Sequence, residues 1–141
     1  MEASDLSQAL RLSISTFVRA TRAQADALPA SRSETLRELA RSGPQPMAAL
    51  AAGRGVSHQT VSRMVGELEQ LGLVTRAPNP TDARGFLIAI SPHGQAALDA
   101  DQQARHHRIS AAITTALTPS ERQTLAQLPG LLDRLTEAMT G

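Results

Sequence analysis

The stretch "GVSHQTVSRMVGELEQLGLVTR", residues 55–76, combines two chemically different faces at helical spacing. Apolar side chains return every three or four residues, at Val61, Met64, Val65, Leu68 and Leu71. This spacing places them in one stripe, which we expect to be buried against the rest of the domain. The other early positions carry small or hydrogen-bonding side chains. The stretch therefore predicts a helix that packs with one face and leaves its polar first turns exposed.

The residues around this helix indicate a helix-turn-helix. Ser57 is suited to cap the helix, and Gly72 is suited to end it. A short helix, "PMAALAA" at 46–52, precedes it and stops at a glycine-containing turn. Ala51 is small enough for close contact between the two helices, and Gly55 lies in the tight turn that joins them. A helix-turn-helix requires both features, together with a buried apolar anchor in its second helix.

The sequence after this helix changes to the pattern of a β-hairpin. "LVTRA" at 73–77 and "FLIAI" at 86–90 are rich in strand-forming residues, and the segment between them is rich in turn residues. A hairpin directly behind the second helix predicts a winged helix-turn-helix. At its tip, Arg84 can enter a minor groove, where narrow A·T-rich segments attract guanidinium groups, and Asp82 is placed to orient an arginine by a salt bridge.

Two further helices are predicted before the helix-turn-helix. The first is amphipathic over 5–27 and ends before Pro29. The second begins with a capping box, in which Ser31 caps the helix and Glu34 lies three residues later. Gly43 and the proline after it close this helix.

Two helices are also predicted after the wing. Ser91 caps the first of them, which continues to about Thr115. "TPSE" at 118–121 repeats the capping device and begins a last helix that runs to about Met139. Pro129 is expected to break or kink this helix, because proline lacks the backbone N–H that a helix interior needs.

The composition agrees with one mainly α domain that has about six helices and a small β-hairpin wing. The 141 residues suit a single domain, and two Phe without Tyr or Trp leave the core to aliphatic side chains. The absence of Cys excludes thiolate metal sites, catalytic Cys and thiol-based redox sensing. No apolar run reaches the roughly 18 residues of a membrane span, so a soluble cytoplasmic protein is expected.

The charge of the chain gives only weak support for nucleic-acid binding. A net charge of +1 does not by itself indicate DNA. All of the basic residues are Arg, however, and the guanidinium group suits bidentate contacts to phosphate or guanine. The free N–H groups and the dipole of a helix N-terminus also attract phosphate.

Residues 47–94 carry the features "LA", "GVS", "TVSR", "LE", "GLV", "D.R" and "IS" in a specific order. In this order they resemble the core of the multiple-antibiotic-resistance regulator (MarR) family of winged-helix transcription factors. Helices of suitable length extend the resemblance over nearly all of 1–141. The resemblance implies a DNA-binding lobe at 31–91 and a helical dimerisation region made of 1–30 and 92–141.

The resemblance further implies a homodimer whose first and last helices interleave. The apolar faces of Leu6 to Val18 and of Leu125 to Leu135 suit such an interface, because exposing these stripes in a monomer would be costly. Packing of the stripes within their own chain is the alternative. Two winged lobes in a dimer predict a pseudo-palindromic double-stranded operator with half-sites roughly 34 Å apart.

The resemblance also assigns DNA contacts. The recognition helix matches Ser57 to Arg63, and the wing arginine of "D.R" matches Arg84, with Asp82 as its acidic partner. Arg54 and Arg76, which follow the first and second helices of the helix-turn-helix, are added to this set. The predicted DNA-binding residues are Arg54, Ser57, His58, Gln59, Thr60, Ser62, Arg63, Arg76, Asp82 and Arg84. Which side chains of the recognition helix contact a base is left open.

Three positions depart from the family pattern. Arg54 stands where such turns usually bury an apolar residue, and it could add a phosphate contact. Ala83 takes the place of a second wing arginine, which could weaken or narrow wing binding. Ile90 and Ser91 replace the usual "LT", and this change keeps the helix cap.

The resemblance implies a repressor that a small molecule releases from DNA. Many such proteins release DNA when a small, often aromatic anion enters the cleft between the dimerisation and DNA-binding lobes. In this chain Phe17, Arg19 and Arg22 are the candidates for that cleft. A solvated surface charge is the alternative for each arginine. No cofactor is expected.

Other function classes have weaker support. A metal sensor would depend on residues such as His93, Asp99, Asp101, His106 and His107, but the adjacent histidines point about 100° apart on a helix. An enzyme is not expected, because the one Ser–His–Asp set, at Ser91, His93 and Asp99, lies at a helix start without an oxyanion-hole motif. A winged-helix dimer that serves only as a protein-interaction module remains open.

Overall fold

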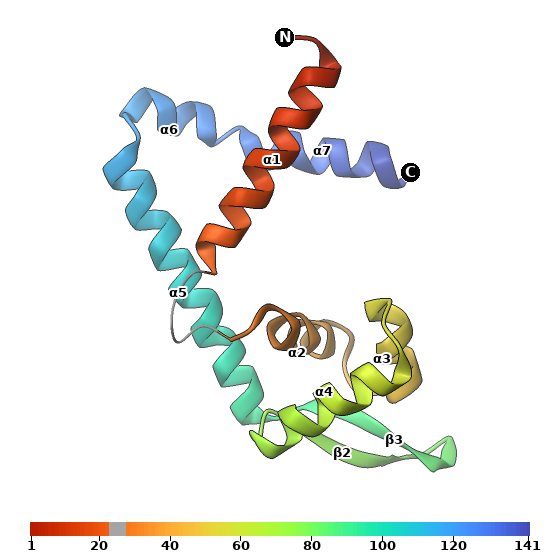
Figure 1. Cartoon of the computed structure of the whole chain (residues 1–141). Helices are drawn as coiled ribbons and strands as arrows, with labels where there is room; N and C mark the ends of the chain where they lie inside the picture. The colour runs from red at the N-terminus through yellow and green to blue at the C-terminus, as the bar shows by residue number, and fades with distance from the viewer. Residues whose placement is uncertain (23–27) are drawn as a thin grey trace. The chain divides into compact units, whose positions relative to one another are not determined.

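The computed structural model describes residues 1–22 and 28–141 and confirms a mainly α fold with a small β-sheet (Figure 1). In chain order its elements are α1 (Ala3–Thr21), α2 (Ala30–Ser42), β1 (Gln45–Pro46), α3 (Met47–Arg54), α4 (His58–Gln70), β2 (Val74–Asn79), β3 (Asp82–Ile90), α5 (Pro92–Ala116), α6 (Pro119–Leu125) and α7 (Leu128–Thr140). The chain forms two compact units, Met1–Ala104 and Arg105–Gly141. We refer to α2, α3, α4 and the sheet as the winged lobe.

The wing is a sheet of three strands rather than a hairpin of two. β3 lies in the middle and pairs antiparallel with β2 on one side and with the short β1 on the other. In β1, Gln45 pairs with Ile88, and Pro46 pairs with Leu87. The sequence pattern does not predict β1, because this strand has only two residues and contains a proline, which is tolerated at a sheet edge where no N–H has to pair.

One hydrophobic core holds the winged lobe together and reaches the start of α5. Its buried members come from α2, α3, α4, the sheet and α5, and they are Leu36, Leu39, Leu50, Ala51, Val61, Val65, Leu68, Leu73, Val74, Ile88 and Leu98. Every element of the lobe except the edge strand β1 therefore contributes a side chain to the same core. This packing fixes α4 relative to the wing.

The predicted stripe of α4 is buried except at its last position. Val61, Val65 and Leu68 are at most 1% exposed, and Met64 packs against the core as a partly buried residue. The prediction for Leu71 is wrong, because this side chain is 48% exposed. Leu71 is the C-cap of α4, and Gly72 turns the chain there with φ of +74°, so the residue lies outside the regular helical stripe.

The predicted capping box of α2 does not form. The helix begins at Ala30 with Pro29 at the N-cap position, and no side chain caps it. Glu34 instead lies 3.2 Å from Arg54 and 3.8 Å from Arg22. Proline one residue earlier allows the helix to begin there because its φ suits a helix start, and this frees the Glu34 carboxylate for ion pairs.

The break predicted in the last helix is present between α6 and α7. Pro129 lies in the first turn of α7, where its missing N–H costs no helical hydrogen bond. The capping box of α6 is also confirmed, because Thr118 accepts from the Glu121 N–H and the Glu121 carboxylate accepts from the Thr118 N–H. The hydrogen bond from the Thr118 backbone N–H to the carboxylate, followed by a contribution from the Thr118 side chain, lowers the pKa of Glu121 from its usual 4.5.

The helices α1, α6 and α7, which we call the terminal helices, contain no buried residue within the described parts of the chain. α1 ends at Thr21, earlier than the predicted end at about residue 27, and residues 23–27 of that prediction lie outside the described residues. Among the described residues, no helix is long and apolar enough to cross a membrane.

Candidate nucleic-acid interface

The turn between α3 and α4 has the geometry that a helix-turn-helix requires. Gly55 adopts a left-handed conformation with φ of +64°, which side chains other than glycine rarely adopt. Ala51 is 6% exposed in the contact between the two helices, and Val61 is 1% exposed as the anchor of the second. Ser57 caps α4 by accepting the Thr60 N–H at 3.1 Å. The predicted roles of these residues in the turn are therefore confirmed.

The first two turns of α4 present polar side chains to solvent. His58, Gln59, Ser62 and Arg63 are exposed, whereas Thr60 is half-buried. The Ser57 hydroxyl is occupied within the protein, since it also donates to the Thr60 hydroxyl at 2.8 Å. His58 and Ser62 lie on the flank of the helix that faces the wing. Gln59 and Arg63, each one residue later, lie about 100° further around the helix axis.

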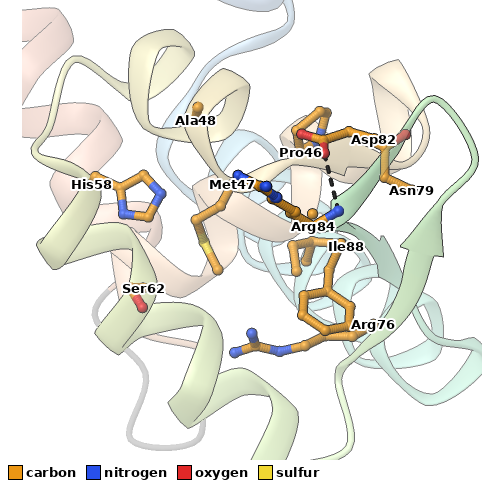
Figure 2. Close-up of a pocket in the computed structure, with 12 residues that line it drawn as sticks. Pro46, Met47, Ala48, His58, Ser62, Arg76, Asn79, Asp82, Arg84 and Ile88 are labelled. Atoms are coloured by element: carbon orange, nitrogen blue, oxygen red, sulfur yellow. Dashed lines mark hydrogen bonds between the residues drawn. The ribbon is translucent and has the colours of Figure 1, made fainter.

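A pocket of about 370 Å³ lies between α4, the start of α3 and the wing (Figure 2). His58 and Ser62 line it from α4, and Arg76 and Arg84 line it from the two strands of the wing. In Figure 2 the Arg84 side chain points into this pocket, toward Met47 at the start of α3. The winged lobe thus brings two predicted wing residues and two predicted recognition-helix residues to one surface.

The role predicted for Asp82 differs from what the structure shows. Its carboxylate accepts the backbone N–H of Arg84 at 3.0 Å, and no ion pair joins it to an arginine within the described chain. Asp82 therefore shapes the turn at the wing tip, as an aspartate does when it accepts an N–H two residues further on. The guanidinium of Arg84 is left available for other partners.

The two other predicted arginines are held by glutamates. Arg76 Nε lies 3.1 and 3.2 Å from the carboxylate oxygens of Glu69, which ties β2 to the end of α4. The side chain of Arg54 is only 15% exposed, and its guanidinium lies 3.2 Å from the carboxylate of Glu34 on α2. The position of Arg54 does not favour the predicted phosphate contact, because its donors already have partners inside the lobe.

Phe86, a large apolar side chain at this surface, was not among the residues predicted from the sequence. Phe86 is 51% exposed, lines the pocket and pairs across the wing with Pro78. Strand alternation puts it on the same face as Ile88, which is 0% exposed. That alternation was visible in "FLIAI", but only the structure shows that the core ends at Ile88, so that Phe86 lies beyond it.

The junction of the wing with α5 explains why Ser91 is not a candidate nucleophile. Its hydroxyl donates to the Gly72 carbonyl at 2.5 Å and accepts the Gly94 N–H at 2.9 Å, and the residue is 7% exposed. Its predicted role as the cap of α5 is thereby confirmed. A Cβ added at Gly94 would overlap the Leu73 carbonyl oxygen, so this close contact requires glycine.

The predicted effector and metal residues are not gathered into one site. Phe17 is 55% exposed on α1, Arg19 is also exposed, and Arg22 lies 3.8 Å from Glu34. Over residues 1–22 and 28–141, no three His, Cys, Asp or Glu side chains lie close enough together to hold a metal ion.

Comparison with known proteins identifies the family of this chain. The family model described as the MarR family matches residues 28–85. An uncharacterized helix-turn-helix transcriptional regulator of Mycobacterium bovis is 33% identical over 137 residues, which cover 96% of this chain and 92% of that protein. The chain belongs to the MarR family of transcriptional regulators.

Solved structures agree with membership of the MarR family. A putative transcriptional regulator from Pseudomonas aeruginosa has a TM-score of 0.84 and 28% identity, and the match covers 96% of this chain and 98% of that one. A mutant of MarR from E. coli shares the fold, with a TM-score of 0.73, 22% identity and coverage of 96% and 97%. The MarR family consists of transcriptional regulators rather than enzymes.

Proposed function

We propose that this MarR-family regulator is a homodimeric, sequence-specific DNA-binding repressor. The observation that carries the proposal is the division of α4 into two faces. Val61, Val65 and Leu68 hold one face in the core, while the first two turns expose polar side chains beside the wing. A helix held in this way, with its N-terminus outward, suits the major groove of DNA.

The side chains of α4 and of the wing have different roles in this proposal. His58, Gln59, Ser62 and Arg63 are the candidates for base contacts, because they are exposed polar groups on a rigid helix. Arg84 enters the minor groove or contacts phosphate from the wing. Arg76 remains paired with Glu69 and supports the base of the wing.

The apolar faces of the terminal helices support the homodimer. Leu6 on α1 is 53% exposed, and Leu131 and Leu135 on α7 are 43% and 48% exposed. Stripes of exposed leucine on long helices mark surfaces that pack against another chain. Two lobes in one dimer would bind a pseudo-palindromic operator and occlude a promoter.

Release by a small aromatic anion completes the proposal. The exposed ring of Phe17 and the guanidinium of Arg19 on α1 offer an apolar contact and a cation for such a ligand. Binding of the anion would change the spacing of the two recognition helices in the dimer. Because the spacing of the two half-sites on DNA is constant, the altered dimer would no longer fit both of them. Because the protein acts on chromosomal DNA, we place it in the cytoplasm, as predicted from its sequence.

Binding to fragments from around its own gene, measured over a range of salt concentrations, tests the DNA-binding proposal. Arg84→Ala is expected to weaken binding and to lower the salt slope, whereas Gln59→Ala or Arg63→Ala should cost about 1–3 kcal/mol if either side chain contacts a base. Arg41→Ala is the control, because Arg41 is exposed and paired with Glu38 within α2.

The outcomes separate the candidate functions. Preference for one fragment over random DNA at physiological salt supports the proposed function as a sequence-specific regulator. If no fragment exceeds random DNA, the proposal is wrong, and weak, salt-insensitive binding would favour a protein-interaction module instead. Light scattering of the free protein at micromolar concentration tests the homodimer separately.

A further inference from the structure

Arg54, at the end of α3, lies in an unexpected polar cluster inside the winged lobe. Its Nη2 is 3.2 Å from Oε2 of Glu34, and its side chain is 15% exposed. Its Nη1 donates to the Ser31 carbonyl at 3.0 Å and to the Thr35 hydroxyl at 2.6 Å. All of these partners lie in the first turns of α2. The guanidinium therefore attaches the end of α3 to α2 through three acceptors.

The same cluster extends to α4 and to the end of α1. The Thr35 hydroxyl, on a residue 1% exposed, lies 2.9 Å from the sulfur of Met64 in α4. On the other side, Oε1 of Glu34 lies 3.8 Å from Nη1 of Arg22, the C-cap residue of α1. Two neighbouring residues of α2 thus link three other helices through polar contacts.

We propose that Arg54 is a positioning residue that sets the orientation of the helix-turn-helix against α2, and that Glu34 couples this orientation to the end of α1. The proposal rests on the proposed DNA-binding function. Only the tight turn around Gly55 separates Arg54 from α4, so a tilt of α3 moves the first turns of the recognition helix. A movement of Arg22 at the end of α1 would therefore affect the first turns of α4 through Glu34 and Arg54.

The rival role for Arg54 is the direct phosphate contact. The two roles predict opposite effects of Glu34→Gln on affinity for DNA. If Arg54 positions α3, loss of the Glu34 charge loosens it, and affinity falls about threefold to fivefold, as the loss of a partly exposed ion pair permits. If Arg54 contacts phosphate, removal of the competing carboxylate frees the guanidinium and affinity rises.

Arg54→Met provides a second readout through the dependence of binding on salt. A positioning role predicts weaker binding with an unchanged salt slope, whereas a lost phosphate contact lowers the slope by about one. Arg54→Lys keeps the charge but cannot reach all three acceptors, so it should restore part of the lost affinity. Arg41→Met is the matched control, because the Arg41–Glu38 pair lies within α2, and it should bind DNA as the wild type does.

Fluorescence anisotropy with the operator fragment measures all four variants, after circular dichroism has shown that each is folded. If Arg54→Met does not fold, the isosteric change Glu34→Gln still shows whether affinity for DNA falls or rises. Unchanged or higher affinity of Glu34→Gln overturns the positioning role and leaves DNA binding intact. Failure of the wild-type protein to prefer any fragment overturns the proposed function, and the positioning role with it.

Discussion

The winged lobe and the terminal helices use apolar side chains in opposite ways. In the lobe, Leu36, Leu50 and Val65 are 0% exposed and belong to one core. In the terminal helices, Leu6 and Leu135 are 53% and 48% exposed, although they follow the same helical spacing. The same amphipathic pattern therefore has two outcomes, burial within the chain and a face available for another chain. The difference separates a lobe that has its own buried core from helices whose apolar faces are exposed, as the proposed dimer requires.

The largest expected effect comes from charges placed on the exposed stripe of α7. Leu131→Asp combined with Leu135→Asp should weaken the proposed dimer by on the order of 5 kcal/mol, about a thousandfold or more, because each change would place a charge in the apolar interface that the dimer buries. Analytical ultracentrifugation should show a shift from dimer to monomer. Glu137→Arg, on the opposite side of the helix, is the control and should leave the dimer intact. A double variant that remains dimeric would show that the exposed leucines of α7 do not form the dimer interface.

The next largest effect compares how a buried and an exposed leucine near α4 contribute to the stability of the winged lobe. Leu68→Ala should reduce the free energy of unfolding by about 2–5 kcal/mol, since it leaves a cavity in the core. Leu71→Ala, at a side chain 48% exposed, should cost less than about 1 kcal/mol. Urea denaturation followed by circular dichroism, at one protein concentration, measures both. Equal losses would mean that Leu71 is buried in solution, for example by a second chain.

A smaller contrast separates two glycines of the first compact unit. Gly94→Ala should destabilise the protein by about 1–3 kcal/mol, because its Cβ would overlap the Leu73 carbonyl oxygen and displace α5 from the wing. Gly53→Ala, with nothing within 4 Å of the added atom, should stabilise α3 by about 0.5–1 kcal/mol. Thermal melting of the two variants compares them directly. A neutral Gly94→Ala would show that the junction of the wing with α5 can adjust.

The smallest effect concerns the capping box of α6. The hydrogen bonds from Thr118 lower the pKa of Glu121, so the folded state holds this carboxylate ionised more strongly than the unfolded state does. The resulting stability is present above pH 4.5, the usual pKa, and is lost as the pH falls through the lowered value in the folded state. Glu121→Ala should therefore melt at a lower temperature near neutral pH, and its difference from the wild type should shrink in acid. A difference that stays constant with pH would assign the effect to helix propensity.

Much of the winged lobe was predictable because its signals are local. Helical spacing located α4, Ser57 and Gly72 marked its ends, and the left-handed turn at Gly55 followed from the need for glycine. The residue motifs from "LA" to "IS", in their order along residues 47–94, carried the resemblance to the MarR family. These features depend on backbone geometry and on the period of a helix or strand, which a sequence carries directly.

The details of the interface were less predictable because they depend on which charged groups meet. All four charged residues Arg54, Arg76, Arg84 and Asp82 were predicted at the DNA-binding surface, with Asp82 as the acidic partner of the wing arginine. Tertiary packing placed Arg54 against Glu34 of α2 and paired Arg76 with Glu69. Asp82 instead accepts the backbone N–H of Arg84, two residues further along the chain. A guanidinium has a long, flexible side chain, so its partner is determined by distant residues that the local pattern does not identify.

The sequence by itself determined the winged helix-turn-helix of this protein, since helical and strand periods, caps and turn glycines act over a few residues. Only the tertiary structure decided that β1 joins the sheet and that the Glu34 carboxylate pairs with Arg22 and Arg54 instead of capping α2. Each of these outcomes depends on contacts between segments that are far apart in the chain or on where the core ends. Such contacts are set by the packing of whole elements against one another.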